Sequence, residues 1–325
     1  MFWLWTGFVA LILLFLAIDL GLFHKSSRKV GTREAVAWTM VWIAVSLLFN
    51  VFVYYLYDNH WFGIGLAADG ITVMRTGEQA AVEFFTGYLI EKSLSFDNIF
   101  VIALVFAYFK VPAEYQHRVL FWGILGALVF RAILISLGVL LVTHFNWIFY
   151  IFGLILIYSA IKIITFDDEH ADPEKGLVLR LARRFLPISA GFDGQNFTTR
   201  RDGKFAFTTL MLVLLVVEAT DVVFAFDSIP AIFAITDEPF IILTSNIFAI
   251  LGLRALYFVL AGLMDRFKYL NWALAIILVF VGAKMLLHDF VHIDTTVSLI
   301  VIAVLLASGI ALSLWRSPPS DGSDA

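Results

Sequence analysis

Nine apolar segments, each long enough to cross a bilayer, constrain the fold of this chain more than any other feature. A transmembrane helix needs about 20 mainly apolar residues, and all nine segments are close to that length. They cover residues 2–23, 35–57, 83–109, 119–142, 147–166, 206–235, 241–264, 269–289 and 296–315. The sequence therefore predicts an all-α polytopic membrane protein with about nine transmembrane helices.

Composition excludes a water-soluble protein. Apolar residues make up 61% of the chain and charged residues 15%, whereas soluble domains are about half apolar and roughly a quarter charged. The chain has no cysteine, which excludes disulfides, thiolate metal sites and thiol redox centres. Its net charge is −4 and it has no basic block, so we expect the lipid bilayer, not nucleic acid, as its partner. The sequence identifies no protein partner.

Basic residues between the segments predict the orientation. Among the loops between the segments, those that follow even-numbered segments contain only Arg75, and all the other basic loop residues follow odd-numbered segments. Because Lys and Arg concentrate in cytoplasmic loops, we predict an external N-terminus and a cytoplasmic C-terminus in a bacterial inner membrane.

Two hydrophilic stretches interrupt the segments: in this orientation residues 58–82 form a periplasmic loop, and residues 167–205 form a cytoplasmic linker. Within the linker, LVLRLARR is either part of a simple connector or a short helix lying on the anionic inner leaflet. The residues after Arg316 are predicted to be a disordered tail.

An internal repeat divides the chain. IEKSLSFDNI at 90–99 resembles TDVVFAFDSI at 220–229, and similar matches follow in the next two segments. The matched polar pairs are Glu91 with Asp221, Asp97 with Asp227, Asn98 with Ser228, Arg131 with Arg254 and Lys162 with Lys284. The offsets for the Glu91, Arg131 and Lys162 pairs are 130, 123 and 122 residues. Charges matched at nearly constant offset indicate one three-helix unit present twice.

The repeat predicts the domain organisation. Each unit holds three spans, and no span lies between the units, so the second unit must be inverted relative to the first. Inverted three-helix repeats are typical of transporters, with the substrate site near the midplane. The predicted parts are two N-terminal helices (1–57), the outer loop (58–82), repeat 1 (83–166), the linker (167–205), repeat 2 (206–290), and a last helix with a short tail (291–325).

Charged residues inside the predicted spans are the candidate functional residues. The candidate metal ligands are Glu91, Asp97, Asn98, Glu218, Asp221, Asp227 and Ser228. The candidate counter-charge or gating residues are Lys92, Arg131, Lys162, Arg254 and Lys284. A charge at mid-membrane costs about 2.5–3.5 kcal/mol on the insertion scale, so these groups must face inward and be neutralised. They could be structural ion pairs alone, but the concentration of acids on two equivalent segments favours a shared site.

Spacing along the helix adds a further expectation. Glu91 and Asp97 are six residues apart, as are Asp221 and Asp227, which separates them by about 120° on a regular helix. Each pair converges on one ligand only if the helix is unwound between its members, or if each acid pairs with the opposite repeat. Pro230 removes a backbone hydrogen bond and predicts a helix break in the sixth segment, as in many transporter ion sites.

The ligand chemistry points to a hard divalent cation. Carboxylate, amide and hydroxyl oxygens favour Ca²⁺, Mg²⁺ or Mn²⁺, and the seven histidines lie in loops or near segment ends. We expect the cation to be a transported substrate and expect no permanently bound cofactor. Burial and neighbouring acids raise a carboxyl pKa, so proton coupling is a further hypothesis.

Three stretches of the sequence carry a family resemblance. EKSLSFDNIF at 91–100, EATDVVFAFDSIPAIFAI at 218–235 and SNIFAILGLRALYF at 245–258 resemble the TerC family, and within it the Alx-type bacterial inner-membrane proteins. The resemblance covers essentially all the spans. It implies divalent cation transport, chiefly manganese efflux.

The residues and the resemblance together favour Mn²⁺ efflux by alternating access, not an enzyme. The choice of Mn²⁺ over Ca²⁺ rests on the resemblance alone. An amino-acid exporter is an alternative, with Lys162 and Lys284 available for a substrate carboxylate. A membrane scaffold that supports metalation of exported proteins is another. An intramembrane aspartyl protease is disfavoured because no G-x-G-D stretch accompanies the acids.

Overall fold

The protein is described here from a computed structural model. It describes residues 2–23, 31–67, 71–145, 147–165, 177–189, 191–201, 204–260, 268–287, 289–291 and 293–316. The predicted disordered tail and the first part of the linker lie outside these residues.

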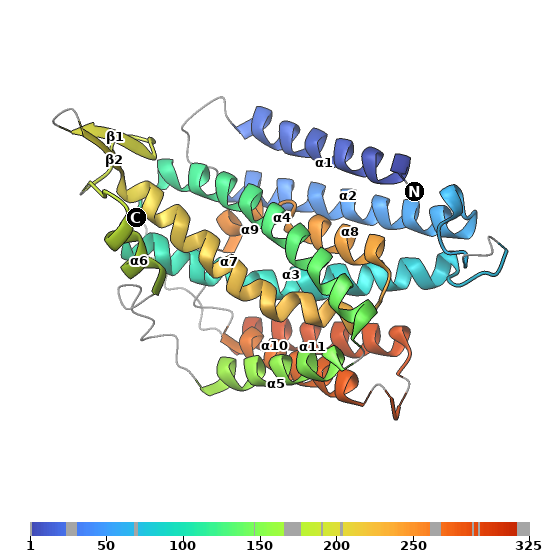
Figure 1. The fold of residues 1–325 in the computed structure, drawn as a ribbon. Helices are drawn as coiled ribbons and strands as arrows, with labels where there is room; N and C mark the ends of the chain where they lie inside the picture. Colours follow the sequence, from blue (N-terminus) through green and yellow to red (C-terminus); the bar gives the residue numbers. More distant parts are fainter. Residues whose placement is uncertain are drawn as a thin grey trace.

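Helices account for most of the described chain (Figure 1). In chain order the elements are α1 (Phe2–Phe23), α2 (Thr32–Asp58), the short 3-10 helix η1 (Trp61–Gly63), α3 (Gly77–Tyr108), α4 (Ala113–His144), α5 (Ile148–Thr165), α6 (Leu177–Phe185), β1 (Thr198–Arg201), β2 (Lys204–Phe207), α7 (Thr209–Phe233), α8 (Pro239–Ile250), α9 (Leu253–Leu260), α10 (Lys268–Leu286) and α11 (Thr295–Arg316).

The long helices run roughly side by side (Figure 1). Helices α1 and α2 lie at one edge, α5, α10 and α11 lie together at the opposite edge, and α3 passes between them. In the centre, α3 packs against α7 and α8, and α7 also packs against α4. This central group of α3, α4, α7 and α8 contains most of the charged residues that the sequence singles out.

An aromatic cluster fixes the N-terminal helices to the centre. Phe49 of α2 stacks on Phe248 of α8 with ring centroids 4.2 Å apart, and Phe8 of α1 contacts both rings. Phe84 of α3 packs edge-on against Phe248. Aromatic pairs of this kind add stability beyond the area they bury, so α8 is anchored from three sides.

The helices meet the requirements of a membrane protein. Five described helices are long and apolar enough to cross a bilayer, and a sixth span results if the bent pair α8–α9 is counted as one. Large apolar side chains such as Leu13, Leu48 and Val304 are exposed on the outside, as lipid-facing positions require. The chain is therefore an all-α polytopic membrane protein. Each of the nine predicted segments coincides with a helix or helix pair, but their number as spans stays a prediction.

The predicted helix break at Pro230 is wrong. Helix α7 continues through Pro230 and ends three residues later at Phe233. Pro230 still removes the hydrogen bond to the Phe226 carbonyl, but the helix continues past it, and the Pro230 carbonyl accepts from the backbone N–H of Ala234 at 3.1 Å. The interrupted span is the next one, since α8 and α9 meet at an angle of 42° around Gly252, whose φ is +79°.

The linker contains more structure than the sequence analysis predicted. The segment LVLRLARR, for which the sequence left a simple connector and a short helix open, forms a helix, α6, which places Leu179 and Ala182 against Leu212 of α7. An unpredicted antiparallel hairpin, β1–β2, follows, with Thr198 opposite Phe207. The sequence does contain a signal for it, since Asp-Gly at 202–203 is a common two-residue hairpin turn.

Candidate functional site

A buried ion cluster joins three of the central helices. The guanidinium of Arg131 (α4) lies between the carboxylates of Glu91 (α3) and Asp221 (α7). Its Nη1 donates to Glu91 Oε1, its Nη2 donates to Asp221 Oδ1 at 3.1 Å, and its Nε donates to Asp221 Oδ2 at 3.3 Å. The three residues are only 2%, 1% and 5% exposed, respectively. Paired donation from one guanidinium to a carboxylate is a strong and directional arrangement.

Amide and hydroxyl groups complete the cluster. Asn98 Nδ2 donates to Asp221 Oδ1 at 2.9 Å, and Ser228 Oγ accepts from Arg131 at 3.1 Å. Asn246 Nδ2 of α8 donates to Glu91 Oε2 at 2.9 Å. Sequence reasoning missed Asn246, although it lies within SNIFAILGLRALYF, because no polar residue matches it in the first repeat.

One oxygen in the cluster has no partner. Asn98 is 3% exposed, and among the described residues its Oδ1 makes no hydrogen bond. A buried amide oxygen left unsatisfied costs free energy, so this oxygen is a candidate ligand atom of the cluster. We refer to Glu91, Asn98, Arg131, Asp221, Ser228 and Asn246 as the central cluster.

The remaining predicted acids are placed differently. Asp227 accepts a hydrogen bond from Ser159 of α5. Glu218 packs against Gly126 of α4, where an added Cβ would lie 1.9 Å from the carboxylate. Asp97 is half-buried on α3. Of the five acids predicted as ligands, Glu91 and Asp221 are thus the two that bind the Arg131 guanidinium.

The predicted bases other than Arg131 also occupy separate places. The Lys92 ammonium donates to the backbone carbonyl of Ala249 at 3.1 Å, and that of Lys284 donates to Ser298 Oγ at 2.9 Å. Arg254 is buried in α9, and Lys162 is exposed on α5.

The described residues contain no group of three or more His, Asp or Glu side chains arranged to hold a metal ion. The central cluster provides two carboxylates. A divalent cation bound there would need the amide and hydroxyl oxygens of Asn98, Ser228 and Asn246 as further ligands. Such mixed oxygen sites suit hard cations.

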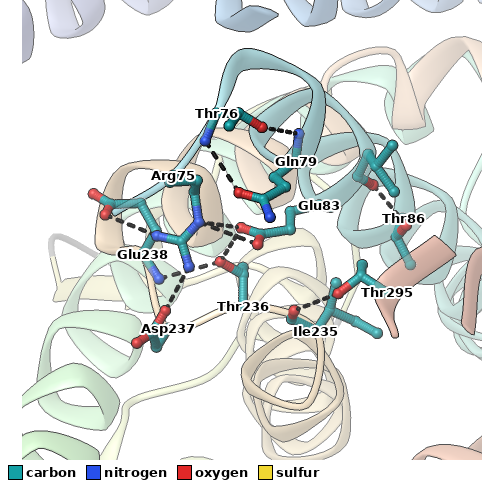
Figure 2. A network of polar contacts seen from close by, with 11 residues as sticks. Arg75, Thr76, Gln79, Glu83, Thr86, Ile235, Thr236, Asp237, Glu238 and Thr295 are labelled. Atoms are coloured by element: carbon teal, nitrogen blue, oxygen red, sulfur yellow. Dashed lines mark hydrogen bonds and ion pairs between the residues drawn. The ribbon is translucent and has the colours of Figure 1, made fainter. Parts of the chain in front are cut away.

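A second ion network surrounds Arg75, before the start of α3 (Figure 2). Arg75 pairs with Glu83 at 2.9 Å and reaches across to Asp237 at 2.7 Å and Glu238 at 3.2 Å in the α7–α8 connection. Thr236 Oγ1 donates to Glu83 Oε2 at 2.6 Å. The network therefore ties the beginning of α3 to the end of α7. A cavity of about 690 Å³ lies beside it and is also lined by residues of α10 and α11.

Removing Arg75 is expected to destabilise the protein more at neutral than at acidic pH. Burial raises the pKa of the Glu238 carboxyl, so its protonation favours the folded state, and that contribution is lost as the pH rises through the folded-state pKa. Arg75→Ala leaves the ionised carboxylate without its partner, which costs about 1–3 kcal/mol.

Unfolding curves in detergent at pH 5 and pH 8 would measure this difference. Arg75→Lys, which keeps the charge, is the matched control and should show a smaller loss. A deficit in Arg75→Ala that is equal at both pH values would contradict the electrostatic account.

Comparison with known proteins identifies the family. The sequence model of the "Integral membrane protein TerC family" matches residues 76–320. A Myxococcus xanthus protein named "Uncharacterized membrane protein STKORF319" is 46% identical over 322 residues, covering 99% of this chain and 95% of the relative. An Escherichia coli K12 protein named "Putative membrane-bound redox modulator Alx" is 46% identical over 315 residues, covering 96% of this chain and 94% of the relative.

A Rickettsia felis membrane protein is 42% identical over 312 residues, covering 96% of this chain and 97% of the relative. No solved structure matches the chain. The family match spans most of the chain, and the relatives align over nearly their full lengths, so the chain is a member of the TerC family of multi-pass integral membrane proteins.

Proposed function

We propose that this protein is a divalent cation transporter of a bacterial inner membrane, exporting Mn²⁺ by alternating access. The observation that carries the proposal is the central cluster. Two acids from matched positions of the proposed repeats, Glu91 and Asp221, meet at one buried point inside a membrane protein. Buried charges at such depth are costly and mark substrate or ion pathways.

The helix arrangement supports an inverted repeat. In the proposed repeat, α3 corresponds to α7 and α4 corresponds to the pair α8–α9. Helix α3 packs on α8, and α7 packs on α4, so each contact is the equivalent of the other in the opposite unit. Figure 1 shows α3 and α7 running in opposite directions, as inversion of one unit requires. In transporters built this way the substrate binds between the repeats, and the central cluster draws its residues from both proposed units.

The donor set supports a hard cation. Two carboxylates, the hydroxyl of Ser228 and the buried Asn98 Oδ1 are all oxygen donors, the type preferred by Mg²⁺, Ca²⁺ and Mn²⁺. Mn²⁺ is preferred among these because of the family resemblance. Glu218, Asp97 and Asp227 are proposed to act along the route, with proton coupling through one of the buried acids. The distribution of basic loop residues supports an external N-terminus.

Transport by purified protein in proteoliposomes tests the proposal. Uptake of Mn²⁺, Ca²⁺ and Mg²⁺ would be compared for the native chain, Glu91→Gln and Asp221→Asn. We expect Mn²⁺ movement to fall by on the order of 100-fold or more in both variants, because each loses one of two charged ligands. Glu34→Gln, at an exposed position in the first turn of α2, is the matched control and should transport normally.

The remaining outcomes separate the alternatives. If Ca²⁺ moves and Mn²⁺ does not, the proposed ion is wrong, but the central cluster remains the proposed cation site. If no divalent ion moves in folded protein, amino-acid export is the next assay. If neither substrate moves, capture of partner proteins tests the scaffold hypothesis.

A further inference from the structure

The guanidinium of Arg131 occupies the position that a bound cation would need. It donates to both carboxylates of the central cluster and to Ser228 Oγ, which are the same oxygens that would hold a metal ion. Arg131 and a divalent cation therefore cannot use these oxygens at the same time. Only when the guanidinium leaves can the carboxylates turn to a metal.

We propose that Arg131 is a tethered counter-cation that replaces the cargo in the unloaded transporter, an inference that rests on the proposed function. A divalent cation neutralises the charges of Glu91 and Asp221 completely. Without it, two negative charges would remain in a low-dielectric site, which is unfavourable. The positive charge of Arg131 offsets one of these two negative charges, and its guanidinium hydrogen-bonds both acids. Lys92, the residue after Glu91 in the chain, adds a second positive charge nearby. The empty site can then pass through the closed state that alternating access requires.

Glu218 provides a second place for the guanidinium when cargo binds. It lies three residues before Asp221 on α7, so the two side chains share a helix face. Its Oε2 is buried and makes no hydrogen bond within the described part of the chain, and its carboxylate rests on α4, the helix that carries Arg131. Binding of a cation at Glu91 and Asp221 would thus release Arg131 toward a carboxylate that is available.

The proposal separates two kinds of flux. Exchange of internal for external Mn²⁺ uses only loaded forms of the protein. Net export also requires the empty protein to return. If Arg131 serves the empty form, its loss must reduce net export more than exchange. A residue that only stabilises the fold would reduce both fluxes together.

The test uses proteoliposomes that contain Mn²⁺ and the full-length protein. Net efflux is measured into metal-free buffer, and exchange is measured by entry of radioactive Mn²⁺ from buffer containing unlabelled Mn²⁺. In Arg131→Gln we expect the ratio of net efflux to exchange to fall by on the order of tenfold or more. We also expect Mn²⁺ to bind this variant in detergent more tightly than the native protein, because the competing cation is gone.

Two results would overturn the inference: an unchanged flux ratio, which includes an equal loss of both fluxes, or weaker Mn²⁺ binding in folded Arg131→Gln. If Arg131→Gln does not fold, Arg131→Lys decides, since its single ammonium cannot make the paired bonds and should also lower the ratio. An unchanged ratio in that variant is equally contradictory. Failure of the proposed function is distinguishable, because the native protein would then show neither net efflux nor exchange of Mn²⁺.

Discussion

The double variant Glu91→Gln/Asp221→Asn is expected to lose about 3–5 kcal/mol of stability, because it leaves the Arg131 guanidinium buried without a counter-charge. Arg131 is 2% exposed, so water cannot replace the two carboxylates. The polar groups that remain, Ser228 and the amides, can accept hydrogen bonds from it but carry no charge.

A triple variant that also carries Arg131→Met is expected to recover most of this loss. The triple variant no longer holds a buried charge in the cluster, whereas removing one side of a buried ion pair leaves the other charge uncompensated and is strongly destabilising. Unfolding by denaturing detergent in mixed micelles would compare the native, double and triple variants. If the triple variant is no more stable than the double one, the cost does not come from the unpaired charge.

Gly252→Ala is expected to cost about 2–5 kcal/mol through two separate effects. Gly252 has a φ of +79° at the junction of α8 and α9, and a residue with a Cβ loses about 1–2 kcal/mol there. An added Cβ would also lie 2.7 Å from three side-chain carbons of Trp42 on α2, and overpacking of this kind costs about 1–3 kcal/mol.

Gly63→Ala is a matched control for the second effect. Gly63 has a φ of +74°, and no atom lies within 4 Å of the position its Cβ would take. Thermal unfolding of both variants in the same detergent should therefore show a larger loss for Gly252→Ala. Equal losses would mean that Trp42 moves aside at no cost and that only the backbone conformation matters.

Much of the helical architecture could be predicted from the sequence because membrane helices depend on local composition. In lipid, a run of about 20 apolar residues can satisfy its backbone N–H and C=O groups only through hydrogen bonds within the segment, which makes it helical. Proline is a local signal, so the sequence predicts a break at Pro230 within the sixth segment, whereas the bend of the structure lies in the next segment, between α8 and α9. The true bend at Gly252 depends on how closely α2 approaches, which one sequence does not show.

The candidate site was predicted in part. Glu91 and Asp221 could be identified because charges are rare in apolar segments and because the proposed repeat pairs them. Which base lies between them depends on tertiary packing, and five bases were equally eligible. Asn246 could not be predicted, because no polar residue matches it in the proposed first repeat and because a neutral amide becomes informative only when α8 is placed beside Glu91.

The contact between α5 and α10 limits how the protein can move. A Cβ added at Gly153 would lie 2.9 Å from the carbonyl oxygen of Gly282, and the reverse placement gives the same distance, so the two backbones touch. Helices joined this closely cannot slide independently. In the proposed repeat, helix α5 belongs to the first unit and α10 to the second, and α11 packs on α10. If the protein works by the proposed alternating access, the moving body that contains α5 and α10 would combine helices from both units, and the mechanical division of the molecule would differ from its division into repeats.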